Sequence, residues 1–171
     1  MIELTPFKPS DFDRFISWID SKELLITIAG TVLTYPLTTD QLHTYLNDSK
    51  SISFNVVDII QSKTIGHAEI IRTGIGTCKL DKILIGDKAI RGKGIGEELM
   101  NELLDYSFGK LDINEVELYV YDWNIAGIKC YEKVGFVINP DKIQTTNLDN
   151  IEWTALNMTI DRNKWEEKSS R

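Results

Sequence analysis

The chain has 171 residues, of which 42% are hydrophobic and 26% charged, and its net charge at pH 7 is −7. This length and composition are typical of one soluble globular domain, which we expect to span residues 1–171. The negative charge argues against a nucleic-acid partner, because phosphates would be repelled. No apolar stretch approaches the roughly 20 residues that span a bilayer.

The cysteines and the N-terminal residues indicate where the protein works. The first residues have neither the basic start nor the apolar run of a signal peptide. Cys78 and Cys130 lack CxxC or zinc-like spacing. We therefore expect a cytoplasmic protein with reduced thiols, no metal site and no membrane partner.

The first half of the chain predicts two helices and a β-meander. A strand is expected over residues 2–6. A helix capped by Ser10 and Asp11 follows, then a loop or short helix over 24–35, then a second helix capped by Thr39. Alternating apolar residues predict strands over 52–57, 64–72 and 78–85, separated by polar and glycine-containing turns.

The second half alternates helices with strands. A glycine-rich run over 91–96 opens an amphipathic helix with Ile95, Leu99, Leu103 and Leu104 on one side. A strand over 116–121, a helix over 125–134 stopped by Gly135, and strands from 136 and over 153–160 follow, with a short helix capped by Asp161. This order predicts an α/β (α+β) fold with a partly parallel sheet covered by helices.

The glycine-rich run has the chemistry of a phosphate-binding turn. Gly92, Gly94 and Gly96 let backbone N–H groups surround an anion at a helix N-terminus, and Arg91 and Lys93 add charged donors. A Walker loop is excluded because Lys93 is followed by glycine. A dinucleotide fingerprint is excluded because Glu97 holds the place of its last glycine. The alternative is a tight turn that binds no ligand.

Two motifs lie on either side of the strand predicted at 116–121. Arg91, Gly94 and Gly96 form an Arg-x-x-Gly-x-Gly pattern, and Asn124 precedes a helix that ends in Tyr131-Glu-x-x-Gly-Phe136. In these motifs the chain resembles the GNAT acetyltransferases. Stretches 64–70 and 104–108 and the block 131–136 most resemble the RimJ/RimL and spermidine acetyltransferase branch.

The resemblance implies a GNAT fold: a central mixed, mostly antiparallel, twisted sheet flanked by helices. In this fold the strand ending near Gly86 splays away from strand 116–121, and the opened edge binds the pantetheine arm of acetyl-CoA. The implied acetyl-CoA contacts are Leu84, Ile85, Gly86, Arg91, Gly92, Lys93, Gly94, Ile95, Gly96 and Asn124. Lys88 and Gly86 depart from the proline and the branched residue that relatives commonly carry at these two positions.

The resemblance also implies an activity, transfer of an acetyl group from acetyl-CoA to a primary amine by direct attack. The amine belongs to a small cationic amine, a polyamine, an aminoglycoside or a protein N-terminus. Tyr131 is the expected general acid; alone, it would be read as a core aromatic.

Glu69 is the first candidate to deprotonate or hold the amine. A solvent-facing strand glutamate is the alternative, and Asp81, Asp122 or a water molecule are other candidate bases. His67 shares the face of Glu69 by period-two alternation and could assist it, whereas Cys130 is expected to pack. The alternative function is a non-catalytic acetyl-CoA-binding module. We expect a monomer or a homodimer.

Overall fold

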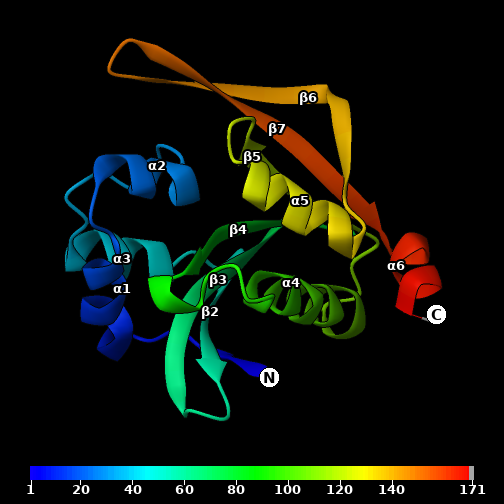
Figure 1. Ribbon diagram of the computed structural model, residues 1–171, viewed down its shortest axis with the longest axis horizontal. Coiled ribbons are helices and arrows are strands. Elements are labelled where there is room, and N and C mark those ends of the chain that lie inside the picture. The colour runs from blue at the N-terminus through cyan, green and yellow to red at the C-terminus, as the bar shows by residue number, and fades with distance from the viewer. Residues whose placement is uncertain (170–171) are drawn as a thin grey trace.

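The computed structural model describes residues 1–169, within which one seven-stranded sheet is flanked by six α-helices (Figure 1). The strands are β1 (Ile2–Pro6), β2 (Ser51–Asp58), β3 (Lys63–Gly74), β4 (Thr77–Ile85), β5 (Glu115–Tyr121), β6 (Val137–Leu148) and β7 (Ile151–Asp161). The helices are α1 (Phe12–Trp18), α2 (Lys22–Ala29), α3 (Thr39–Leu46), α4 (Ile95–Asp105), α5 (Ile125–Val134) and α6 (Arg162–Ser169). The mixed α/β fold is confirmed.

The sheet has the order β1-β2-β3-β4-β5-β7-β6, and only β4 and β5 run parallel to each other. Their pairing is limited to Thr77–Lys79 opposite Glu115–Glu117, after which the two strands separate. All other neighbours are antiparallel. The mostly antiparallel sheet and the splayed strand pair are therefore confirmed.

A β-bulge interrupts β4 where it leaves β5. The pairing of β3 with β4 passes from Glu69–Asp81 to His67–Leu84, so two residues of β4 stand opposite one of β3. Lys82 lies in this bulge with a φ of +46°, a left-handed conformation that is uncommon for lysine. The extra residue shifts the alternation of side chains by one. As a result the side chain of Leu80 lies in the largest hydrophobic core of the protein, here called the main core. The side chain of Leu84 lies on the other side of the strand, against α1–α3.

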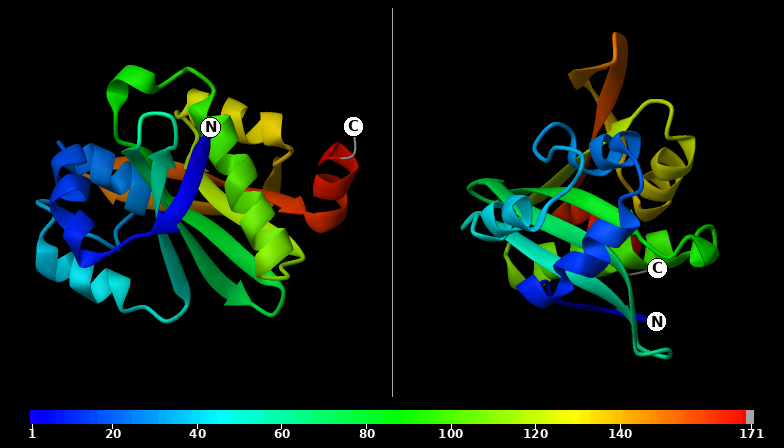
Figure 2. Two further views of the ribbon diagram at one scale, coloured as in Figure 1. Left: turned by 90° about the horizontal axis from the view of Figure 1, so that it is seen from below. Right: turned by 90° about the vertical axis from the view of Figure 1, so that its left-hand side faces the viewer.

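The helices form two groups: α4 and α5 pack in the main core, and α1–α3 pack on the other side of β4 (Figures 1 and 2). Helix α4 buries the expected apolar face in the main core, with Leu99, Leu103 and Leu104 fully buried. Helices α1–α3 enclose a second core around Phe15. The long hairpin of β6 and β7 reaches across toward α2 (Figure 1), where Lys22 and Asp149 form an ion pair at 2.9 Å.

Two local expectations need correction. The second helix is capped by Thr38 rather than Thr39, because the Thr38 hydroxyl accepts the Gln41 N–H. The segment expected as a loop or short helix contains α2, which starts earlier because Ser21 caps it through the Leu24 N–H. In residues 1–169 no helix is both long and apolar enough to cross a membrane.

Candidate active site

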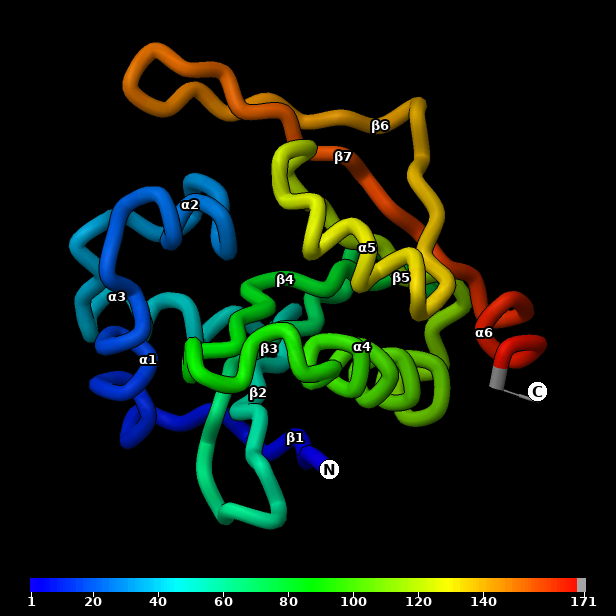
Figure 3. The backbone as a smooth tube through the Cα atoms, in the orientation of Figure 1, coloured from blue at the N-terminus to red at the C-terminus, as the bar shows by residue number. Residues whose placement is uncertain are grey.

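The turn between β4 and α4, whose path is visible in Figure 3, contains two glycines in a left-handed conformation. Gly92 and Gly94 have φ angles of +76° and +85°, and Gly94 is the N-cap of α4. A Cβ at either position would meet open space, so the conformation and not crowding requires glycine. Arg91 ties the turn to the end of β4 through a hydrogen bond from Nε to the Ile85 carbonyl, at 2.9 Å. The turn therefore presents the N-terminal amides of α4 to solvent.

A cavity of about 470 Å³, here called the β4–α5 cavity, lies between the free edge of β4, the glycine turn and α5. Beyond Lys79, no strand within residues 1–169 pairs with this edge of β4, although the Ile85 carbonyl accepts a hydrogen bond from Arg91. The walls include nine of the residues predicted from the sequence: Leu84, Ile85, Arg91, Gly92, Gly94, Ile95, Gly96, Asn124 and Tyr131. An apolar strand edge beside an anion cradle fits the uncharged arm and the phosphates of acetyl-CoA.

Two further cations border this cavity and were not predicted. Lys129 and Lys133 lie four residues apart on α5, so they share one face of the helix. Lys133 is 3.9 Å from Glu97. The sequence signal for these two lysines was their four-residue spacing on a helix that was already predicted to carry Asn124 and Tyr131.

Gly86 and Lys93 lie outside the cavity wall, unlike the rest of the expected acetyl-CoA contacts. The N–H of Gly86 already donates to the Ile65 carbonyl at 2.8 Å. A Cβ at Gly86 would come within 2.1 Å of the Trp18 indole. Glycine is therefore needed here for the close approach of Trp18 to the strand. Lys93 is an exposed residue of the turn.

Tyr131 projects from α5 into the β4–α5 cavity. The helix is fixed at its start by Asn124, whose Oδ1 accepts the Gly127 N–H at 3.0 Å, and the Tyr131 ring contacts Phe136. Burial, and to a smaller degree the charges of Cys130 and Asp81, raise the pKa of the Tyr131 phenol well above its ordinary value. The phenol is therefore protonated at neutral pH and can donate a proton or a hydrogen bond.

A second cavity of about 180 Å³, here called the α2 cavity, lies where β4 and β5 separate. It is bordered by α2 and the loop after it, by Lys79–Asp81 of β4, by Tyr119 and Tyr121 of β5, and by residues of the β6–β7 hairpin. The β4–α5 cavity reaches the same strand at Ile83–Ile85. The two cavities thus adjoin β4 on either side of the bulge at Lys82.

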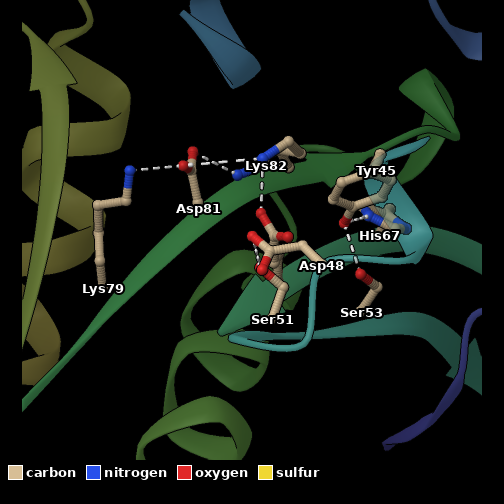
Figure 4. A network of polar contacts seen from close by, with 9 residues as sticks. Tyr45, Asp48, Ser51, Ser53, His67, Lys79, Asp81 and Lys82 are labelled. Atoms are coloured by element: carbon tan, nitrogen blue, oxygen red, sulfur yellow. Dashed lines mark hydrogen bonds and ion pairs between the residues drawn. The ribbon is translucent and has the colours of Figure 1, made fainter. Parts of the chain in front are cut away.

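Glu69 lies inside the protein, with 1% of its surface exposed, and lines neither cavity. Its Oε2 is 2.6 Å from the Nζ of Lys82, which is equally buried. Burial raises the pKa of Glu69 and the Lys82 ammonium opposes that rise. Asp81, the alternative candidate, lines the α2 cavity with its side chain 19% exposed and pairs with Lys79 at 2.8 Å (Figure 4).

His67 shares the face of Glu69, but it is fully buried and its Nε2 is 2.9 Å from the Tyr45 hydroxyl. Burial lowers the pKa of His67 to about 3, so the ring is neutral. Cys130 borders the β4–α5 cavity close to Gly96, and burial raises the pKa of its thiol. Asp122 is exposed just after β5. Within residues 1–169 no three His, Cys, Asp or Glu side chains are grouped as metal ligands would be.

Comparison with known proteins gives the family. The model of the acetyltransferase (GNAT) domain family matches residues 2–137. An N-acetyltransferase 9-like protein of Nematostella vectensis is 26% identical over 147 residues, or 79% of this chain and 74% of that protein. The spermidine N(1)-acetyltransferase of Vibrio cholerae is 31% identical over 93 residues, or 54% of this chain and 53% of that protein.

Solved structures agree on the fold. Spermidine N-acetyltransferase from Vibrio cholerae in complex with CoA and spermine superimposes with a TM-score of 0.82 at 22% identity, covering 96% of this chain and 98% of that one. An aminoglycoside acetyltransferase in complex with coenzyme A gives 0.77 at 19% identity, covering 99% of each chain. With the family model covering most of its length, the chain belongs to the GNAT family and is an N-acetyltransferase that uses acetyl-CoA.

Proposed function

We propose that the enzyme acetylates a primary amine of a small acceptor, which attacks the acetyl-CoA thioester directly. The observation that carries this proposal is that two cavities adjoin β4 on either side of the bulge at Lys82, one bordered by Tyr131 and the other by Asp81. Tyr131 and Asp81 thus face two cavities that adjoin the same strand only a few residues apart. Positioning of two reactants in this way supplies much of the rate enhancement in such transfers.

The chain's residues have separate tasks in binding acetyl-CoA. The amides of the glycine turn, with Arg91, Lys129 and Lys133, hold the phosphates. The open backbone edge at Leu84 and Ile85 receives the pantetheine arm in the manner of an added strand, and Asn124 contacts the arm. Bound there, acetyl-CoA supplies an activated acyl group.

Tyr131 presents its O–H to the departing sulfur. As the amine nitrogen bonds to the carbonyl carbon and the C–S bond breaks, the thiolate takes the proton of the phenol. Because burial keeps the phenol protonated at neutral pH, the donor is available in every turnover. The excess proton on the new amide nitrogen leaves to a base or to water, and the Tyr131 phenolate regains a proton from water before the next turnover.

Asp81 is the carboxylate best placed to hold the acceptor amine. Its side chain reaches the α2 cavity, and its partner Lys79 is a half-exposed side chain that can turn away when an ammonium group arrives. Glu69, the first candidate from the sequence, has weaker support, because its carboxylate is bound to Lys82 and borders no cavity. Its direct role in catalysis stays a prediction.

The charges around the α2 cavity favour one class of acceptor. Asp81 is the single carboxylate among the residues that line it, and Lys79 is the single cation. The remaining wall is made of hydroxyl, amide and aliphatic groups such as Thr31, Thr146 and Gln144. This lining fits a small amine with one ammonium group near the thioester better than it fits a polyamine, whose further charges would lack partners.

The test is thiol release from acetyl-CoA across a panel of amines: monoamines, an amino sugar, spermidine, an aminoglycoside and a peptide with a free N-terminus. We expect acceptor-dependent release, with a small monoamine giving the highest kcat/KM. Tyr131→Phe is expected to lower kcat by ~10²-fold with acetyl-CoA affinity unchanged. Tight acetyl-CoA binding without release for any amine would instead support the non-catalytic module.

A further inference from the structure

Lys82 is a buried cation that the proposed reaction does not use. It occupies the β4 bulge and is 3% exposed. Its Nζ is 2.6 Å from Glu69 Oε2, 3.8 Å from Asp81 Oδ2 and 4.9 Å from the centre of the Tyr45 ring. Figure 4 shows Lys82 between Asp81 and Lys79 on one side and Tyr45 and His67 on the other. The ammonium is therefore held in place by two carboxylates and an aromatic face.

The geometry joins the bulge to the acceptor site. The backbone N–H of Lys82 donates to Asp81 Oδ1 at 2.9 Å, so the bulge itself orients the carboxylate that borders the α2 cavity. In a regular strand the side chain of Lys82 would point away from the face that carries Asp81. The bulge turns it back, and its ammonium is anchored on β3 through Glu69.

The charges explain why Glu69 is needed. A buried ammonium without a full counter-charge draws the nearest carboxylate to itself. Without Glu69 that carboxylate would be Asp81, whose Oδ2 is 3.8 Å from Lys82 Nζ, and an acceptor ammonium would have to compete with Lys82 for the same oxygens. Glu69, at the shorter distance, neutralises Lys82 and leaves the charge of Asp81 to the cavity.

We propose that Lys82 and Glu69 are a positioning pair: together they fix the β4 bulge, and Glu69 keeps Lys82 from competing with the acceptor for Asp81. This inference rests on the proposed role of Asp81 in binding the amine. It assigns Glu69 a role as counter-ion, in contrast to the general-base role expected from the sequence.

A double-mutant cycle separates the two roles. Glu69→Gln keeps the shape and removes the counter-charge, so the acceptor KM is expected to rise about tenfold, within the usual range of coupling between neighbouring charges, with kcat changed less than threefold. In Glu69→Gln/Lys82→Met both charges are gone, and the acceptor KM is expected to return to within about threefold of wild type. Replacing a buried ion pair by neutral groups is well tolerated. Lys82→Met alone leaves a buried carboxylate unpaired, and its melting temperature is expected to fall.

The controls keep the outcomes distinct. Asp112→Asn removes one negative charge from an almost fully exposed residue and should leave both kinetic constants unchanged. Asp81→Asn tests the proposed acceptor site by itself: an unchanged acceptor KM there would refute the role of Asp81 without bearing on the pair.

A loss of kcat in Glu69→Gln that persists in the double variant would overturn the inference and make Glu69 a catalytic base. A wild-type KM in Glu69→Gln would overturn it as well. If Glu69→Gln fails to fold, wild-type kinetics in the double variant still support the pair, and lost kcat there still refutes it.

Discussion

His67 is held inside the protein between the rings of Phe7 and Phe15, with ring centres 4.5 and 4.4 Å away. Its Nε2 faces the Tyr45 hydroxyl, and its buried Nδ1 has no hydrogen-bond partner among residues 1–169. Besides burial, the charges of Lys82 and Arg14 lower the pKa of His67, while the charge of Asp11 opposes them. The residue is thus a neutral member of the second core, and the strand alternation that paired it with Glu69 identified its face but not its environment.

The burial of His67 makes stability depend on pH. Its pKa is about 3 in the folded protein and 6.5 in the unfolded chain. Between these values the unfolded chain binds the proton and the folded protein does not, so stability falls as the pH drops below 6.5. We expect the free energy of unfolding of wild type, relative to His67→Gln, to fall by about 1.4 kcal/mol per pH unit between pH 6 and pH 4.

Urea unfolding of both proteins across this pH range measures the effect. His43→Gln, at the other histidine of the chain, controls for loss of a histidine from an exposed position on α3. Curves of wild type and His67→Gln that run parallel below pH 6.5 would mean that His67 is protonated in the folded protein.

At the scale of single elements, the turn before α4 was the easiest part to predict and the bulge in β4 the hardest. The turn is marked by glycines, the residue that adopts a φ near +80° at the least steric cost. The bulge contains Lys82 and Ile83, residues that also fit a regular strand. The extra residue is evident only in the pairing of β4 with β3. That pairing depends on both strands, so the sequence of β4 alone does not predict the bulge. The buried Lys82–Glu69 pair was missed for this reason.

The glycine turn supports a test in which only the backbone conformation matters. A Cβ at Gly94 meets no atom within 4 Å, and the same holds at Gly109, but only Gly94 has a positive φ. Gly94→Ala therefore strains the turn by about 1–2 kcal/mol, and relief of this strain moves the amides that are proposed to hold the phosphates. We expect the Kd for acetyl-CoA, measured by calorimetry, to rise about tenfold, since 1.4 kcal/mol corresponds to that factor.

Gly109→Ala is the matched control and should bind acetyl-CoA as wild type does. Equal affinities for Gly94→Ala and wild type would show that the turn does not cradle the phosphates. A fall in the melting temperature without a change in Kd would assign Gly94 to the fold alone.

At the scale of the whole molecule, the sequence predicted the strands and helices and the splayed pair but not what covers the α2 cavity. Helix and strand periods report which face of an element is buried. They do not report that a hairpin crosses to a helix more than 100 residues earlier in the chain. In the structure α2, β5 and the β6–β7 hairpin meet in a small cluster of Ile26, Tyr121, Leu148 and Ala155. The ion pair of Lys22 with Asp149, 127 residues apart, fastens the same contact.

Under the proposed function, the two substrates bind to different parts of the molecule. The β4–α5 cavity is walled mainly by β4, the glycine turn and α5, whereas the α2 cavity depends on the hairpin and α2 staying together. Leu148→Ala removes a 6% exposed side chain from the cluster that joins them. Loss of such a side chain costs about 2–3 kcal/mol, and the hairpin should then open away from α2. We expect the acceptor KM to rise severalfold while the Kd for acetyl-CoA is unchanged.

Leu4→Ala, on β1 at the opposite edge of the sheet, controls for a lost leucine side chain and should change neither value. If Leu148→Ala weakens acetyl-CoA binding and acceptor binding to the same extent, the two cavities are not separately supported, and the hairpin acts on the fold as a whole.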